Sequence, residues 1–244
     1  MLRKRIVMLI AAALMTLTAS SAFAAFADLE LLRVVYERTT GTTEQITDMG
    51  AVSTFLTGTH TIAGDALTAN NANNLFVSYM AINKTTGELW VSNSAAVAPI
   101  AVGTAGFNST KTGFNSVYSY YNTLTADANG VKTGSQSAAN SFKSKLDASQ
   151  GSLANGINIA TRTTTEASLA SLVGNAGAAP VAQTLYYFLS GNAGGSIGAN
   201  TGVTILTKAD GSTTTSATPI PPAFFLMGSG LLGMFGLRRK NKVA

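Results

Sequence analysis

The fold of this chain is decided by the stretch Leu75-Phe-Val-Ser-Tyr-Met-Ala-Ile82, followed by Asn83-Lys-Thr-Thr-Gly87 and Glu88-Leu-Trp-Val-Ser92. The first arm is rich in β-branched and aromatic residues, and in the second Leu89 and Val91 alternate with their neighbours. Alternation with a period of two is typical of a strand, and a short segment with Asn and Gly joins antiparallel strands. The stretch therefore predicts a β-hairpin.

Two further pairs of strands are predicted on either side of this hairpin. Residues 29–38 and 43–49 flank the turn Thr39-Thr-Gly-Thr42, and residues 184–189 and 203–207 flank a Gly-rich loop. Both pairs have the composition of strands bounded by turn residues. The chain is thus expected to contain a sheet built from three antiparallel hairpins.

Between the second and third hairpins the spacing of apolar residues changes to that of helices. One apolar stripe is formed by Phe114, Val117, Tyr118, Tyr121 and Leu124, at helical spacing. A second helix is predicted over residues 137–148, with Phe142 and Leu146 facing inward. A third is predicted over residues 167–173, because Thr163-x-x-Glu166 has the pattern of a capping box.

The order of these elements predicts the fold class and the domain organisation. Strands, then helices, then strands indicate an α+β fold with an antiparallel sheet and a central block of short amphipathic helices. One domain is expected over residues 25–211, and the Ser/Thr-rich residues 212–218 are predicted to be a polar linker.

Charge and cysteine content exclude several classes of protein. Seven of the 16 Lys and Arg residues lie at the two ends of the chain, so the body has nine basic against 11 acidic residues. Bulk charge therefore gives no support for nucleic-acid binding. With no cysteine, the chain has neither disulfides nor thiolate metal sites.

The N-terminus has the features of a secretory signal peptide. Residues Arg3-Lys-Arg5 are basic, residues 6–17 are apolar, and Ala22-Phe-Ala24 is a small-x-small cleavage site. A second such site is Ala25-Phe-Ala27. Residues 1–24 are predicted to be removed during export by the Sec export machinery and signal peptidase.

The C-terminus has three parts that predict a membrane anchor. Pro219-Ile-Pro-Pro222 precedes an uncharged run of 15 residues, 223–237, which ends at Arg238-Arg-Lys240. As a helix the run would rise roughly 22 Å, and basic side chains can extend it toward the roughly 30 Å of a bilayer core. Because Lys and Arg collect on the cytoplasmic side, the basic residues place the terminus inside. The alternative is a buried core helix.

These C-terminal residues resemble the PEP-CTERM sorting signal of Gram-negative bacteria. The similarity covers residues 219–244, in a variant with Ile220 at the position of the motif's Glu and with Pro222 at a position where a small residue is usual. The resemblance implies recognition and cleavage by an exosortase, with transfer of the body to the cell surface or the exopolysaccharide matrix. The body more loosely resembles others with this signal, through Asp28-Leu-Glu-Leu31 and Asp48-Met-Gly50.

Candidate catalytic residues are few. His60 is the only histidine, which excludes a multi-histidine metal site, and no Gly-x-Ser-x-Gly elbow accompanies a triad of His60 with Asp65 or Asp48. We expect His60 to lie in a loop. Six acids are candidates for the paired carboxylates of a glycoside hydrolase: Glu30, Glu37, Glu44, Asp48, Asp65 and Glu88. We expect them on strand faces and turns, and solubility is the better explanation for acids at such positions.

Three other motifs carry no specific chemistry. Asp127-Ala-Asn-Gly130 lacks the acids of a calcium loop and is expected to be a turn. The segment Gly191-Asn-Ala-Gly-Gly-Ser-Ile-Gly198 lacks the spacing of a phosphate-binding loop. Five aromatic residues could form a sugar-stacking platform, although half-buried strand positions are the commoner explanation for such residues: Tyr36, Tyr79, Trp90, Tyr186 and Tyr187.

The sequence as a whole predicts an exported surface protein with a structural or adhesive body, no enzymatic activity and no cofactor. The expected partners are the export machinery, an exosortase and the membrane, with exopolysaccharide as a further candidate. The alternative is a secreted carbohydrate-binding or carbohydrate-active protein, which would need at least two convergent ionisable groups in a cleft for catalysis.

Overall fold

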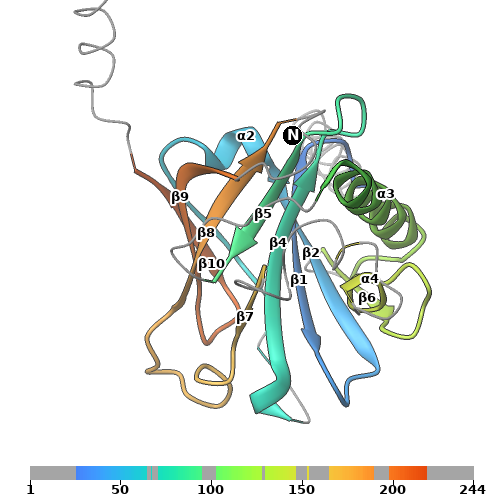
Figure 1. The fold of residues 1–244 in the computed structure, drawn as a ribbon. Helices are drawn as coiled ribbons and strands as arrows, with labels where there is room; N and C mark the ends of the chain where they lie inside the picture. The colour runs from blue at the N-terminus through green and yellow to red at the C-terminus, as the bar shows by residue number, and fades with distance from the viewer. Residues whose placement is uncertain are drawn as a thin grey trace, which may run out of the picture.

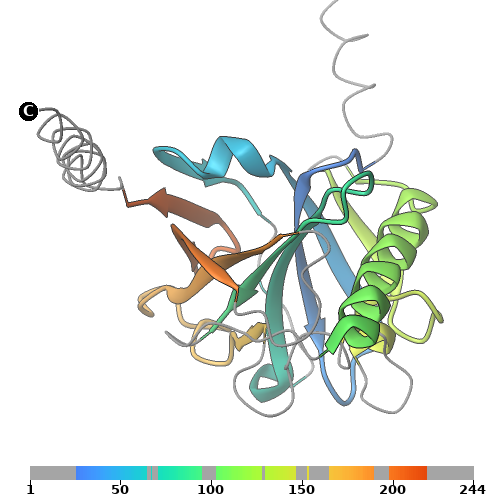
Figure 2. The same ribbon diagram turned by 45° about the horizontal axis from the view of Figure 1, so that its top comes forward.

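The computed structural model describes residues 26–64, 67, 71–94, 103–127, 130–146, 153, 165–189 and 198–218. Within these residues the molecule is mainly a single antiparallel sheet that curls into a half-barrel (Figures 1 and 2). The strand order is β3-β10-β9-β8-β5-β4-β1-β2-β6, and β7 lies beside β4. The strands are β1 (Glu30–Glu37), β2 (Thr43–Ala51), β3 (Thr59–Ile62), β4 (Leu75–Ile82), β5 (Leu89–Asn93), β6 (Val131–Ser135), β7 (Glu166–Ser168), β8 (Val181–Phe188), β9 (Ala199–Thr207) and β10 (Thr213–Ala217).

All three predicted hairpins are present. The strands β1 and β2 pair antiparallel, as do β4 with β5 and β8 with β9. The turn between β4 and β5 is closed by the amide of Asn83, which donates to the carbonyl of Glu88 over 2.9 Å. The periodicity of the sequence is sufficient to predict these pairs because each is local along the chain.

Both faces of the central strands are buried, and the two faces belong to different cores. In β1, the side chains of Leu32 and Val34 pack into one core, and those of Leu31 and Val35 into the other. The helix α3 (Gly103–Asn122) and the short helix α4 (Phe142–Leu146) cover the first of these faces (Figure 1). The second core fills the concave side, with the short helix α2 (Val52–Phe55) and the segment after β7.

The predicted α+β class with a central helical block is wrong, because the described chain is mostly antiparallel β. The predicted third helix is replaced by β7 and a series of turns up to residue 177. Glu166, the expected last residue of a capping box, is instead buried and is held by Tyr36 and Arg38. In the second predicted helix, only the residues of α4 are helical among those described. Long-range partners override the local helix signal.

The predicted polar linker, residues 212–218, is also wrong, because most of it forms β10. This strand lies between β9 and β3, and the hydroxyl-bearing side chains of Thr213 and Thr215 are fully buried on the concave face. The segment lacks an apolar alternation, because hydroxyl groups take the inward positions that apolar side chains usually occupy.

A buried polar network holds the curled sheet together. The guanidinium of Arg33 on β1 donates to the carbonyl of Gly211, to Thr213 Oγ1 over 3.2 Å and to Thr47 Oγ1 over 3.1 Å. The hydroxyl of Tyr79 on β4 lies 2.7 Å from Thr207 Oγ1 and 3.0 Å from Thr213 Oγ1. These contacts join β1 and β4 to β9 and β10 across the concave side, where hydrogen bonds between buried groups are costly to lose.

The sheet divides at β4, and a second polar cluster occupies the fork. The C-terminal half of β4 pairs with β5, whereas its N-terminal half pairs with β7. At the division, the carbonyl of Thr165 accepts hydrogen bonds from Ser78, Ser92 and Gln183, at 3.0, 2.8 and 3.2 Å. The side chains thus satisfy a buried carbonyl for which the ladder provides no partner.

Among the described helices, none has the length and apolar character needed to span a membrane. The predicted membrane segment, residues 223–237, and the predicted signal peptide, residues 1–24, lie outside the described residues.

Candidate functional site

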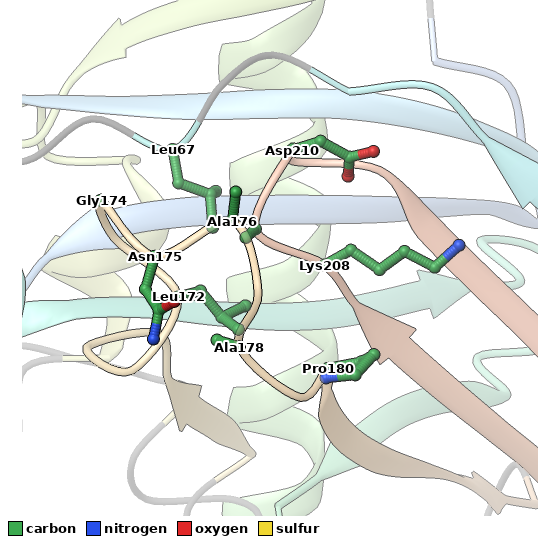
Figure 3. A pocket seen from close by; sticks show the side chains of 10 residues that line it. Leu67, Leu172, Gly174, Asn175, Ala176, Ala178, Pro180, Lys208 and Asp210 are labelled. Carbon is green, nitrogen blue, oxygen red and sulfur yellow. The ribbon is translucent and has the colours of Figure 1, made fainter.

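A surface pocket of about 540 Å³ lies beside the turn between β9 and β10 (Figure 3). Its apolar part is formed by Leu67, Leu172, Ala178 and Pro180. The polar side chains on its lining are Asn175, Lys208 and Asp210. Ligand sites usually combine an apolar lining with a few polar groups, and this volume is sufficient for a small molecule.

The polar side chains of this pocket do not converge on one point. In Figure 3 the side chains of Lys208 and Asp210 extend away from Asn175 and Leu172. The carboxylate of Asp210 accepts a hydrogen bond from the amide of Ser212 over 2.9 Å, and hydrogen bonds with Ser212 lower its pKa. Asp210 is therefore an ionised acceptor at neutral pH and is unsuited to act as a general acid. The pocket has room for a small molecule, but its lining lacks a second carboxylate for acid-base chemistry among the described residues.

Two of the predicted carboxylates meet on neighbouring strands, Glu30 on β1 and Asp48 on β2. Burial raises the pKa of both groups, and the charge of Asp48 further raises the pKa of Glu30. A hydrogen bond joins the two side chains, so they can share one proton. Direct contact leaves no room for a sugar between them, whereas the acids of glycosidases are at least about 5 Å apart. This pair does not match the geometry of a glycosidase.

Glu44 holds the start of α4. Its buried carboxylate accepts hydrogen bonds from Tyr121 Oη at 2.7 Å and from the amides of Phe142 and Lys143 at 3.0 and 3.1 Å. Burial raises the pKa of Glu44, and these hydrogen bonds oppose that shift. With its acceptor sites directed at the protein, Glu44 has a structural role.

Two of the remaining candidate acids, Glu37 and Glu88, accept hydrogen bonds from hydroxyl groups. Glu37 accepts a hydrogen bond from Thr40 Oγ1 over 2.8 Å. Glu88 accepts from Tyr187 Oη over 2.5 Å, which lowers the pKa of Glu88, while burial and this contact raise the pKa of Tyr187 to about 12. Asp65 lies outside the described residues.

His60 lies in β3 and not in a loop, which corrects its predicted position. Its ring packs edge-on against Phe55, with centroids 5.6 Å apart, and its Nε2 lies 2.8 Å from the carbonyl oxygen of Thr57. Both partners come from the residues just before β3. These contacts give His60 a packing role, and neither partner is an acid.

The aromatic platform, the less favoured alternative for these five residues, is not formed. Tyr36 and Tyr186 belong to the core under α3, whereas Tyr79, Trp90 and Tyr187 belong to or pack against the core of the concave side. Four of the five are buried, and only Tyr187 is half-buried. A sugar cannot stack on rings that are split between two cores.

The acid with the most perturbed pKa is Glu166, which the sequence did not mark as a site residue. Burial raises its pKa from the ordinary value of 4.5 to about 8. Tyr36 donates to one carboxylate oxygen, and Arg38 forms an ion pair with the other. The guanidinium of Arg38 also lies over the ring of Phe76, 4.4 Å from its centroid. An acid at the start of a predicted helix gives no signal that could have revealed this cluster.

Several predicted positions cannot be placed. The cleavage residues Ala22 and Ala24, the sorting residues Pro219, Ile220, Pro221 and Pro222, and the basic residues Arg238, Arg239 and Lys240 all lie outside the described residues. Most of the 191–198 segment also lies outside them, and so does part of the 127–130 turn. Within the described part of the chain, no group of three or more potential His, Cys, Asp or Glu ligands could hold a metal ion.

Comparison with known proteins adds no relative, since no protein-family model, no curated protein and no solved structure matches this chain.

Proposed function

We propose that this chain is an exported surface or extracellular-matrix protein of a Gram-negative bacterium, with a structural or adhesive, non-enzymatic body. In this proposal an exosortase-type enzyme recognises Pro219-Ile-Pro-Pro222 and cleaves the chain there, while residues 223–237 hold it in the inner membrane. The export machinery, signal peptidase, exosortase and membrane are its partners, and exopolysaccharide is a candidate final partner.

The observation that carries this proposal is the placement of the body between the two terminal signals. The described fold begins at Phe26, two residues after the predicted signal peptide, and continues to Thr218, directly before Pro219. The described body therefore lies between the two predicted terminal segments. Its acids support a non-enzymatic role. The carboxylates of Glu44 and Glu166 accept hydrogen bonds from buried groups of the protein, and Glu30 is in direct contact with Asp48.

A reporter fusion tests the sorting step. A secreted reporter that carries residues 219–244 should be cut near the prolines in a host with an exosortase and should stay membrane-bound in a host without one. The prolines lack amide hydrogens and cannot continue a helix, which favours an extended junction that a protease can bind. Equal processing in both hosts, or none in either, would overturn the proposal.

Carbohydrate binding is a second candidate function, and the pocket beside Lys208 favours it. Asn175, Lys208 and Asp210 offer donors and acceptors beside an apolar surface, a combination that suits a sugar unit. Binding of the host's purified exopolysaccharide can be measured by calorimetry for the wild type and for Asn175→Ala and Lys208→Ala. Weaker binding by both variants, with no change for Lys84→Ala, which lies outside the pocket, would support this function.

A further inference from the structure

Phe26, the first described residue, is buried in the core beneath α3. Its side chain is only 3% exposed, and its ring lies edge-on to the rings of Tyr118 and Tyr121, with centroids 6.4 and 6.3 Å apart. The ammonium nitrogen of Lys132 on β6 lies 4.3 Å from the centroid of the same ring. The chain therefore enters the core at its second residue after the predicted signal peptide.

The backbone of Phe26 is also in contact with the folded body, through the side chain of Asn122. Its amide donates to Asn122 Oδ1 over 2.5 Å, and its carbonyl lies 3.5 Å from the side-chain nitrogen of Asn122. Asn122 is the last residue of α3, so this contact ties the N-terminus to the end of the helix. The next residue, Ala27, is exposed and donates its amide to Glu30. Phe26 is thus an anchor, and Ala27 belongs to the surface.

The two small-x-small sites differ in what they would leave of this anchor. Cleavage after Ala24 retains Phe26, whereas cleavage after Ala27 removes it. Its loss would leave a cavity beside Tyr118 and Tyr121, and it would remove the ring from the buried ammonium of Lys132. Large-to-small changes in a core are among the most destabilising substitutions.

We propose that Phe26 makes the mature N-terminus an integral part of the folded body, and that the processed bond is therefore Ala24–Ala25 and not the bond after Ala27. This inference rests on the proposed export of the chain. Signal peptidase acts before the chain folds, so the folded structure does not select the bond. Of the two possible products, only the one cut between Ala24 and Ala25 keeps Phe26 and can fill the core beneath α3.

N-terminal sequencing of the full-length chain, exported and recovered from the membrane fraction, tests the bond. The expected first residue is Ala25. Ala24→Gln removes the small residue before the proposed bond, whereas Ala27→Gln changes an exposed side chain and should leave the cut in place. With Ala24→Gln, the chain should stay uncut or begin at Asp28, and in the second case it should resist protease less than the wild type.

Proteolysis tests the anchor independently of the cut. Phe26→Ala in the full chain should raise the rate of digestion by thermolysin more than roughly tenfold, because digestion follows the population of the open state. Phe26→Leu should recover much of the resistance. Leu189→Ala, at a side chain that is 51% exposed, is the matched control and should digest like the wild type.

The two measurements separate this inference from the proposed function. A wild-type chain that begins at Asp28 overturns the assigned bond while leaving export in place. A chain that still begins at Met1 overturns both the bond and the signal-peptidase step of the proposed function, and the proteolysis experiment then tests the anchor by itself. Equal digestion of Phe26→Ala and Leu189→Ala overturns the anchor.

Discussion

The hydroxyl oxygen of Tyr79 lies 3.0 Å from that of Thr213, although three strands separate β4 from β10 in the sheet. Side chains so far apart in strand order can meet only on the concave side of a strongly curled sheet. Thr213 also accepts a hydrogen bond from Arg33, so one hydroxyl joins β10 to both β1 and β4. The last strand before the predicted sorting signal is therefore bound into the centre of the body.

The first prediction concerns this hydroxyl. Thr213→Val keeps the shape of the side chain but removes one hydrogen-bond partner of Tyr79 and one of Arg33, and should lower the free energy of unfolding by about 1–3 kcal/mol. Thr214→Val changes the adjacent, half-buried residue and is the control. Urea denaturation of the two variants would measure the difference. Equal stabilities would mean that the hydroxyl of Thr213 contributes nothing to stability.

The second prediction concerns the pH dependence of stability. The pKa of Glu166 is raised from 4.5 to about 8, so the folded state holds its proton more tightly than the unfolded state. This contribution is fully present below about pH 4.5 and is lost as the pH rises toward 8. The positive charge of Arg38 favours the ionised form of Glu166 and so opposes the rise in its pKa. Because the side chain of Arg38 is 42% exposed, solvent weakens this influence, and burial of Glu166 has the larger effect on the pKa.

Urea denaturation between pH 5 and 8 would measure this dependence. Glu166→Gln should reduce the loss of stability with rising pH, because its amide carries no charge. Glu88→Gln is the comparison: hydrogen bonds lower the pKa of Glu88, so this variant should leave the decline toward pH 8 in place. An unchanged slope in Glu166→Gln would assign the dependence to other groups.

The third prediction concerns access to the sorting junction. The amides of Ala217 and Thr218 donate to the carbonyls of Gly58 and Gly202, each over 2.9 Å, so the folded body continues to the residue before Pro219. A protease must bind several extended residues, and those before the junction are engaged in the sheet. Eight Gly and Ser residues inserted between Thr218 and Pro219 should therefore accelerate processing in an exosortase-containing host. The same insert after Lys242 is the control, and pulse-chase labelling gives the rates; equal rates would show that β10 does not restrict the enzyme.

The fourth prediction concerns the membrane anchor. Replacement of Arg238, Arg239 and Lys240 by Gln should reduce membrane retention or invert insertion, because the positive charges that keep this end in the cytoplasm are lost. Carbonate extraction and protease accessibility of the tail would measure the change. Unchanged results in both assays would favour the alternative of a core helix for residues 223–237.

Local periodicity determined those parts of the fold whose partners lie close along the chain. The hairpin of β4 and β5 follows from the alternation around Trp90 and the turn at Asn83, and the stripe of Tyr118 and Tyr121 marks the apolar face of α3. These signals need only neighbours within a few residues. The terminal signals are likewise properties of composition, and they remain predictions.

Only the tertiary structure decided which segments join the sheet when their partners are distant. Thr163-x-x-Glu166 has a helical signal, but Glu166 lies in β7 because Tyr36, 130 residues earlier, binds its carboxylate and β4 supplies the ladder. Residues 213–217 have the composition of a linker, yet Arg33 and Tyr79 provide hydrogen-bond partners that allow hydroxyl groups to be buried. A polar side chain is buried when its partners are present. The sequence records the polar residues of β10, but only the curl of the sheet brings their partners within reach.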